Sequence, residues 1–336
     1  MDICIAGSRG HLGYVFDALP LLPSVRIVGI HAADRSELAD LERRCAAAGA
    51  EPEVGDDWPA LLDTQGPDAV VVCGPFEEHA AMCVTAFERD VHVFCEKPVA
   101  LTLDELGALR AAFDIASARS GVHFASMMGL RFDPAFYAAR AVVASGGIGD
   151  VRLVSAQKSY KLGERPAYYR ERATYGGTIP WVGSHAIDWI SWFTGKRFVS
   201  VDARHSTASN RGNGTLETTG LCRFELEDRI LASVTVDYLR PEAATTHGDD
   251  RIRVVGTRGV VEVRGGLAYL TDADHPAGEP ILPGPVPGIF ADFLARATGA
   301  GSAADLDGAA TLEVTEACLL ARLSADERRG IEFPGR

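Results

Sequence analysis

Within the first 126 residues, short apolar runs alternate with helical patterns, and this alternation constrains the fold more than any other feature. The apolar runs are expected to form strands at Asp2–Ala6, Val25–His31, Ala69–Cys73, Val91–Cys95 and Val122–Ser126. The segments between them predict helices at His11–Leu19, Glu37–Ala48, Glu77–Glu88 and Leu103–Ser117, the last with a capping box of Thr102 and Glu105. Strands that are covered by helices on both faces are continuously apolar, so the sequence predicts a parallel sheet with helical crossovers.

After Asp150 the pattern changes, and strands dominate. They are expected at Val151–Tyr160, Phe198–Ser206, Glu217–Leu226, Arg229–Leu239, Arg251–Gly256, Val260–Arg264 and Leu267–Thr271. Helices are expected at Gly183–Phe193, Gly288–Ala297 and Ala309–Ser324, and a loop at His275–Gly288. The predicted fold class is therefore α/β, with a doubly wound parallel sheet in residues 1–121 and an α+β domain with a mostly antiparallel sheet in residues 122–336.

Composition excludes several classes of protein. The formal net charge of −13 disfavours nucleic acid and anionic membrane as partners. No apolar stretch approaches the roughly 20 residues of a membrane helix, and nothing at the start indicates export. The seven cysteines are scattered and form no C-x-x-C pair, so no metal site is predicted and a reducing cytoplasm fits best.

The first predicted strand runs into a glycine-rich turn, Gly7-Ser8-Arg9-Gly10-His11-Leu12-Gly13. Its spacing, G-x-x-G-x-x-G, is one residue longer than the usual dinucleotide fingerprint. Glycines allow the backbone to approach a pyrophosphate, and the following helix N-terminus supplies free N–H groups. The sequence therefore predicts a nicotinamide dinucleotide site, although an empty tight turn has the same pattern.

Two further segments extend this predicted cofactor site. Asp34 follows the second strand and would bind the ribose 2′-hydroxyl of NAD, whereas Arg35 beside it would suit the 2′-phosphate of NADP; NAD is favoured and NADP stays open. After the third strand, Gly74 and Pro75 are placed to line the cofactor trough. His79 follows them as a further cofactor residue, with a purely structural role as the alternative.

Glu96-Lys97-Pro98 ends the fourth strand, at the edge where open α/β sheets bind their ligands. Burying an ammonium group is costly unless it has a partner or a chemical role. Lys97 is therefore the first candidate for catalysis.

In the second half, Gly176-Gly177 leads into a predicted helix that carries His185 in its first turn and Asp188 three residues later. A helix N-terminus disfavours a charged imidazole, so His185 is expected to be neutral and able to accept a proton, with Asp188 fixing its tautomer. A satisfied structural histidine is the alternative.

Taken together, these motifs resemble the glucose–fructose oxidoreductase/inositol dehydrogenase/rhizopine-catabolism (Gfo/Idh/MocA) family over nearly the whole chain. The shared segments include Arg131-Phe132-Asp133-Pro134 and Gly256-Thr257-Arg258-Gly259. The resemblance implies NAD(P)-dependent oxidation or reduction of a sugar, cyclitol or polyol, with Lys97 as the catalytic lysine and His185 as the acid/base. It also implies a homodimer or homotetramer formed through an open C-terminal sheet.

One position departs from the family pattern. Many members carry an aspartate four residues before the histidine, and this chain has Trp181 there, whose indole can stack on a sugar face but cannot accept a proton. Tyr160 and Tyr169 are further candidates for substrate contact. The alternatives are a redox-neutral, NAD-dependent glycoside-cleaving enzyme and a nucleotide sensor without chemistry.

Overall fold

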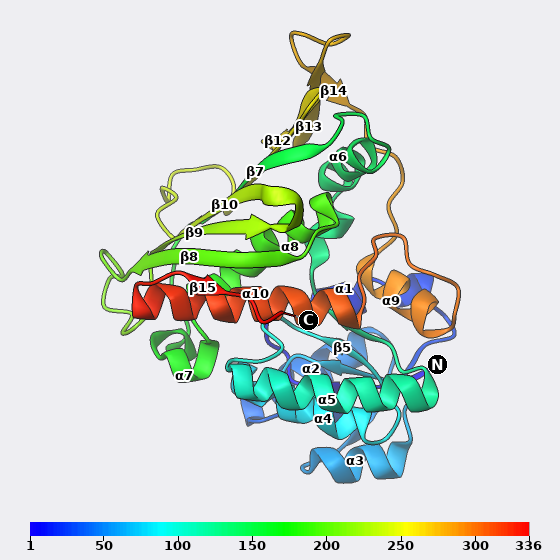
Figure 1. The fold of residues 1–336 in the computed structure, drawn as a ribbon. Helices are drawn as coiled ribbons and strands as arrows, with labels where there is room; N and C mark the ends of the chain where they lie inside the picture. Colours follow the sequence, from blue (N-terminus) through cyan, green and yellow to red (C-terminus); the bar gives the residue numbers. More distant parts are fainter. Residues whose placement is uncertain (336) are drawn as a thin grey trace. The chain divides into compact units, whose positions relative to one another are not determined.

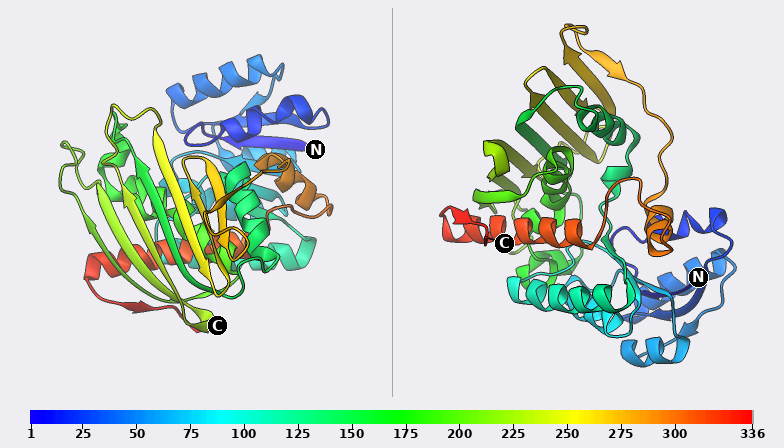
Figure 2. Two further views of the ribbon diagram at one scale, coloured as in Figure 1. Left: turned by 90° about the horizontal axis from the view of Figure 1, so that it is seen from above. Right: turned by 45° about the vertical axis from the view of Figure 1, so that its right-hand side comes forward.

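The computed structural model describes residues 1–335, and the chain divides into two compact units (Figures 1 and 2). The first unit consists of Met1–Met127 and Pro287–Leu312, and the second of Met128–Val286 and Glu313–Arg336. Residues 122–127 and 287–312, which the sequence assigned to the second domain, belong to the first unit. There Phe293 packs on Phe94, with ring centroids 5.0 Å apart.

The first unit contains a six-stranded sheet in the order β3-β2-β1-β4-β5-β6, and every pair in it is parallel. Its strands are β1 (Asp2–Ala6), β2 (Arg26–His31), β3 (Glu53–Val54), β4 (Ala69–Val72), β5 (His92–Cys95) and β6 (Phe124–Ser126). The predicted parallel sheet is thus confirmed. The strand order reverses between β1 and β4, and open sheets of this kind bind ligands at such a switch point.

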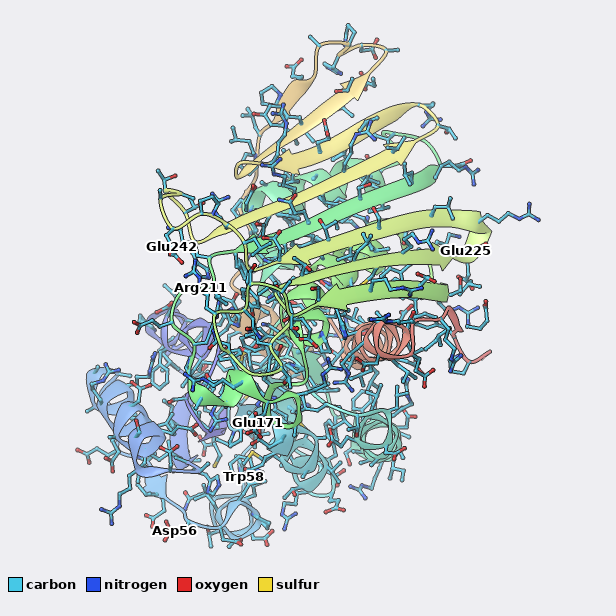
Figure 3. The ribbon with its side chains drawn as sticks, turned by 90° about the vertical axis from the view of Figure 1, so that its left-hand side faces the viewer. Asp56, Trp58, Glu171, Arg211, Glu225 and Glu242 are labelled. Carbon is cyan, nitrogen blue, oxygen red and sulfur yellow. The ribbon has the colours of Figure 1, made fainter. Side chains whose placement is uncertain are left out.

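The helices of the first unit are α1 (Gly13–Phe16), α2 (Arg35–Ala47), α3 (Trp58–Gln65), α4 (His79–Phe87), α5 (Leu103–Ser120) and α9 (Ile289–Ala297). The capping box predicted at Thr102 and Glu105 is present. The helix predicted at His11–Leu19 is shorter, and a 3-10 turn at Leu19–Leu21 follows it. Helix α3, which carries Trp58 (labelled in Figure 3), was not predicted. Trp58 is buried, and its indole Nε1 donates to the Met82 carbonyl oxygen at 3.3 Å.

The second unit contains a nine-stranded sheet in the order β14-β13-β12-β11-β7-β10-β9-β8-β15. Its strands are β7 (Val151–Tyr160), β8 (Phe198–Ser206), β9 (Thr219–Leu226), β10 (Ile230–Asp237), β11 (Gly248–Gly256), β12 (Gly259–Arg264), β13 (Leu267–Asp272), β14 (Glu279–Ile281) and β15 (Ile331–Glu332). All pairs are antiparallel except β7 with β10, which confirms the mostly antiparallel sheet. The short strand β14 lies inside the segment expected to be a loop.

One face of this sheet is buried and the other is open. Helices α6 (Pro134–Ala144) and α8 (Ser184–Thr194) pack on the buried face (Figure 2). Helix α8 contacts β7, β10 and β11, and α6 contacts β12 and β13. Val154, Ala232 and Val254 of neighbouring strands are buried on that face, whereas Leu153 and Leu231 are 40% and 55% exposed on the other. The remaining helices are α7 (Arg172–Tyr175) and α10 (Gly308–Glu327). Over residues 1–335, no helix combines the length and apolarity that a membrane crossing requires.

Candidate active site

The glycine-rich turn lies at the switch point of the parallel sheet. Gly7 N–H donates to the His31 carbonyl oxygen at the end of β2, and Arg9 N–H donates to the Cys73 carbonyl oxygen after β4, both at 2.8 Å. Gly7 has a φ of +73°, and a Cβ there would stand 2.3 Å from the Cα of Gly74. The turn therefore requires glycine at this position, and it brings the ends of β1 and β4 together.

Glu96 connects this turn to the end of β5. Its carboxylate is fully buried, and Oε2 accepts hydrogen bonds from the His11 backbone N–H at 2.5 Å and lies 2.8 Å from His11 Nδ1. Oε1 accepts the Lys97 backbone N–H at 2.9 Å. Burial raises the pKa of this carboxyl, but nearby His11 and Lys97 outweigh burial and hold the pKa below its usual value. The buried group is thus an anion that joins two of the predicted motifs.

Lys97 follows directly, and only 3% of the residue is exposed. Its Nζ lies 3.9 Å from Glu96 Oε1 at the carboxyl end of β5. His79 is also fully buried. Its Nδ1 lies 3.0 Å from the Pro98 carbonyl oxygen, and its Nε2 lies 3.1 Å from the Gly74 carbonyl oxygen. Burial lowers the pKa of His79 despite these carbonyl contacts. Its imidazole bridges the ends of β4 and β5.

Of the other predicted cofactor residues, Asp34 has an unexpected local role. It is the N-cap of α2, and its Oδ1 accepts the backbone N–H groups of Ser36 at 2.8 Å and Glu37 at 3.0 Å. Arg9 extends to the same helix, where its Nε donates to Glu37 Oε1 at 2.5 Å. The rest of the set divides by exposure: Leu12, Gly74 and Pro75 are buried, Ser8 is half-buried, and Gly10 and Arg35 are exposed.

These residues fit a dinucleotide. The tight turn at Gly7 and Gly10 brings bare backbone to the switch point, where a pyrophosphate can approach. Glu37 adds a second sign of fit, because its Oε2 is buried and has no hydrogen-bond partner among the residues that the structure describes. Such an acceptor matches a sugar hydroxyl. In contrast, residues 1–335 hold no group of three or more histidine, cysteine or acidic side chains arranged for a metal ion.

In the second unit, His185 lies in the first turn of α8, as expected, and only 3% of it is exposed. The helical backbone nevertheless begins earlier than predicted, because a π-helical turn at Ile179–Gly183 precedes α8 without a break. The field of a helix terminus weakens beyond the first turn. His185 therefore lies more than one turn into a continuous helical segment, and its expected neutral state stays a prediction.

Asp188 has a partner that the sequence did not predict, Arg131. Arg131 donates to both of its carboxylate oxygens, with Nη2 2.7 Å from Oδ1 and Nε 3.0 Å from Oδ2. Both side chains are almost completely buried, and the guanidinium also lies 5.6 Å from the Trp192 ring. Burial raises the pKa of Asp188, while Arg131 opposes this shift. These contacts join the 3-10 turn at Gly129–Phe132 to α8, and the role of Asp188 beside His185 stays a prediction.

The predicted aromatic substrate residues fall into two groups. Trp181 and Tyr169 are buried together, with an edge-to-face contact and ring centroids 5.7 Å apart. Tyr160 instead lies beside a buried lysine, Lys158, whose Nζ is 4.6 Å from the tyrosine ring and 2.6 Å from Oδ2 of Asp250. Burial lowers the pKa of Lys158 to about 8, although Asp250 partly compensates.

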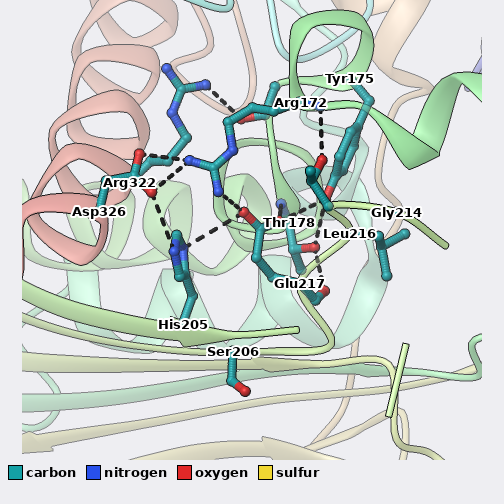
Figure 4. A network of polar contacts seen from close by, with 12 residues as sticks. Arg172, Tyr175, Thr178, His205, Ser206, Gly214, Leu216, Glu217, Arg322 and Asp326 are labelled. Carbon is teal, nitrogen blue, oxygen red and sulfur yellow. Dashed lines mark hydrogen bonds and ion pairs between the residues drawn. The ribbon is translucent and has the colours of Figure 1, made fainter. Parts of the chain in front are cut away.

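A network around Glu217 fixes the segment that leads to His185 (Figure 4). Glu217 is 1% exposed, and its Oε2 accepts the Tyr175 hydroxyl at 2.7 Å and the Thr178 backbone N–H at 3.0 Å. Arg172 donates to Oε1, and its other terminal nitrogen donates to both oxygens of Asp326 at 2.6 Å. Glu217 thus anchors both ends of the diglycine turn, Gly176-Gly177.

Sequence reasoning missed the roles of Glu37 and Glu217 and the pairing of Lys158 with Asp250. The sequence predicts a helix that starts at Glu37 and a strand that starts at Glu217, and an acidic side chain at such a position usually faces solvent. The one available signal was in Lys158, which stands at the inward position of an alternating strand pattern, Val154-x-Ala156-x-Lys158. Lys97 and His185 lie in different units, so their convergence on one nicotinamide stays a prediction.

Comparison with known proteins covers both units. The family model described as an oxidoreductase family with an NAD-binding Rossmann fold matches residues 2–124, and that of the GFO/IDH/MocA C-terminal domain matches residues 136–262. A solved structure from Thermotoga maritima, described only in general terms as an oxidoreductase, is 42% identical, with a TM-score of 0.92 over 99% of this chain and 100% of that one.

Curated relatives are more distant. Inositol 2-dehydrogenase of Paracoccus denitrificans is 25% identical over 94% of this chain and 92% of its own length. The oxidoreductase YrbE of Bacillus subtilis is 29% identical, but the match spans only 61% of this chain and 58% of that protein. Since both halves match in order and the Thermotoga structure matches throughout, the chain belongs to the GFO/IDH/MocA family of NAD(P)-dependent oxidoreductases.

Proposed function

We propose that the protein is an NAD-dependent dehydrogenase or reductase that acts on a secondary alcohol or ketone of a sugar, cyclitol or related polyol. The observation that carries this proposal is the placement of Lys97. Its ammonium group is buried at the carboxyl end of β5, and Glu96 ties the same segment to the glycine turn. A buried lysine at this strand end, beside a dinucleotide turn, supports a role in the chemistry at the cofactor.

In this proposal the bound nicotinamide supplies the hydride acceptor or donor. Lys97 donates a hydrogen bond to the substrate oxygen and stabilises the negative charge that develops on it. His185 accepts the hydroxyl proton during oxidation and returns it during reduction. A positioned acid/base of this kind contributes about 100- to 10,000-fold to the rate.

The substrate class rests on two supports. The Paracoccus relative is named for its action on inositol, a cyclic polyol. In this chain Trp181 stands at the position where many family members carry an aspartate, and it contacts Tyr169; such rings suit the apolar face of a sugar. We therefore propose a cyclic sugar or cyclitol in preference to an open-chain alcohol.

The test is a panel of sugars, cyclitols and glycosides assayed with NAD and NADP at the absorbance band of the reduced nicotinamide. With an active substrate, Lys97→Met is expected to lower kcat at least about 100-fold and to change the Kd for NADH by less than about threefold. Lys196→Met is the matched control, because Lys196 pairs with Asp228 on the surface. Full activity of Lys97→Met would refute the proposed mechanism.

The same panel separates the rival functions. A redox-neutral, glycoside-cleaving enzyme would consume a glycoside without net change in absorbance. A nucleotide sensor would bind the cofactor and convert no compound of the panel.

We also propose that the protein forms a homodimer or homotetramer in the cytoplasm through the open face of the nine-stranded sheet. Exposed leucines such as Leu153, Leu221 and Leu231 support an interface there.

A further inference from the structure

The acid expected to recognise the adenosine ribose, Asp34, is already engaged. Strand β2 ends at His31, three residues before it. Asp34 is exposed, and its Oδ1 accepts two backbone N–H groups at the start of α2. This is the ordinary N-cap role of an aspartate, and a serine can perform it equally well. The carboxylate of Asp34 therefore has a complete structural explanation that involves no cofactor.

Glu37, one turn into the same helix, has no such explanation. The residue is only 8% exposed, and burying a carboxylate in an otherwise solvated first turn is unfavourable without partners. Arg9 of the glycine turn binds Oε1, with Nε at 2.5 Å. Oε2 is buried and has no hydrogen-bond partner within residues 1–335. One oxygen is thus oriented by the protein, and the other is an acceptor that still needs a donor.

The position of this acceptor relative to the turn identifies the donor. Arg9 is fixed by its backbone N–H on the Cys73 carbonyl oxygen, so the Arg9–Glu37 pair lies beside the switch point of the sheet. In a dinucleotide bound at this turn, the adenosine ribose lies toward β2 and α2. A ribose 2′-hydroxyl can donate to Oε2, whereas a 2′-phosphate offers no donor and brings added negative charge.

We infer that Glu37, and not Asp34, selects NAD over NADP in this protein. This inference rests on the proposed function, since it requires a bound nicotinamide dinucleotide. Arg9 acts as the positioning residue that holds the carboxylate. Two cations nearby do not reverse the preference: the charge of Arg9 is compensated by Glu37, and Arg35 is exposed, where water screens its attraction for a phosphate.

The test is direct titration of NADH and NADPH by isothermal calorimetry, without any substrate. The wild-type protein is expected to bind NADH more tightly. Glu37→Gln keeps the shape and removes the charge, so it is expected to shift the ratio of the two Kd values toward NADPH by about 10- to 100-fold. Glu37→Asp keeps the charge but withdraws the acceptor, so it is expected to weaken NADH binding and still exclude NADPH.

Asp34→Ser is the matched control, because serine preserves the cap and removes the charge. It is expected to leave the ratio within about threefold of the wild type. If Asp34→Ser shifts the ratio and Glu37→Gln does not, the inference is overturned. If both nucleotides bind and neither variant shifts the ratio, it is also overturned, while the proposed function stands. If the wild-type protein binds neither nucleotide, both fail.

Discussion

Replacing Glu217 by glutamine tests whether the buried network of the second unit holds the segment that leads to His185. The Glu217 carboxylate accepts hydrogen bonds from the Tyr175 hydroxyl, the Thr178 backbone N–H and the Arg172 guanidinium. Glutamine keeps one acceptor oxygen and presents an NH₂ group in place of the other, so at least one of these donors loses its partner.

The size of the effect follows from these contacts. A hydrogen bond to a charged group contributes about 1.5–3 kcal/mol. Arg172 retains Asp326 and is partly exposed, which reduces the cost of leaving it without Glu217. We therefore expect Glu217→Gln to lower the free energy of unfolding by about 2 kcal/mol, and Glu217→Ala by about 3–5 kcal/mol.

Urea unfolding followed by tryptophan fluorescence measures this change. Three of the four tryptophans, Trp181, Trp189 and Trp192, belong to the second unit, so the signal reports mainly on it. Glu262→Gln is the matched control, because that carboxylate pairs with Arg253 at 3.4 Å in a partly exposed position and contributes about 0–1 kcal/mol. Equal stability of the Glu217→Gln and Glu262→Gln variants would refute the reasoning.

The stability difference between the wild type and Glu217→Gln is also predicted to depend on pH. Burial raises the pKa of Glu217, but Arg172, Tyr175 and the Thr178 N–H outweigh burial, so the pKa in the folded state is lowered. A carboxyl with a lowered pKa adds stability that is complete above the unfolded value of about 4.3 and is lost as the pH falls through the folded value. The stability difference between the wild type and Glu217→Gln is therefore expected to shrink below about pH 4.3.

Two further predictions concern the sheet of the second unit. Lys158 is buried with a pKa lowered to about 8, so between about pH 8 and 10.4 the folded state binds fewer protons than the unfolded state. Urea unfolding of the wild type and of Lys158→Met at several pH values measures the consequence. As the pH rises across that window, the free energy of unfolding of the wild type should increase by up to about 3 kcal/mol relative to the variant. A difference that does not change with pH would contradict the lowered pKa of Lys158. Leu231→Glu on the open face should reduce the mass measured by light scattering to that of a monomer, whereas Leu282→Glu, in a loop where Leu282 is 86% exposed, should not; unchanged mass in both variants would exclude this face as the interface.

Local sequence patterns predicted most of the helices and strands of the fold. The capping box at Thr102 and Glu105 fixed the start of α5, and alternation along β7 gave both ends of that strand correctly. Helices α3 and α6 were missed although each begins with an aspartate N-cap followed by a proline within the first two positions, as in Asp57-Trp58-Pro59 and Asp133-Pro134. That combination is a start signal in its own right and was available in the sequence.

Local sequence signals could not predict which segments pack against distant parts of the chain. Nothing in the composition of residues 287–312 distinguishes them from their neighbours, yet they pack in the first unit through Phe290 and Phe293 on Phe94. The π-helical turn before α8 is another case, because Pro180 and Gly183 predict a later helix start than the one observed. The backbone there is stabilised from outside the helix, by Glu217 on the Thr178 N–H.

The same division separates the site residues that could be predicted from those that could not. Gly7 and Lys97 were identifiable because a turn and a strand end fix their positions locally. Glu37 and Glu217 acquire a role only through a partner 28 or 42 residues away, and the sequence around each is that of a solvated acid. An acidic residue is thus informative about a site when its burial is known, since a buried carboxylate must be paired or must bind something. By this criterion Glu217 is fully accounted for by protein donors, whereas Glu37 is not, and that difference makes Glu37 the stronger candidate for contact with a ligand.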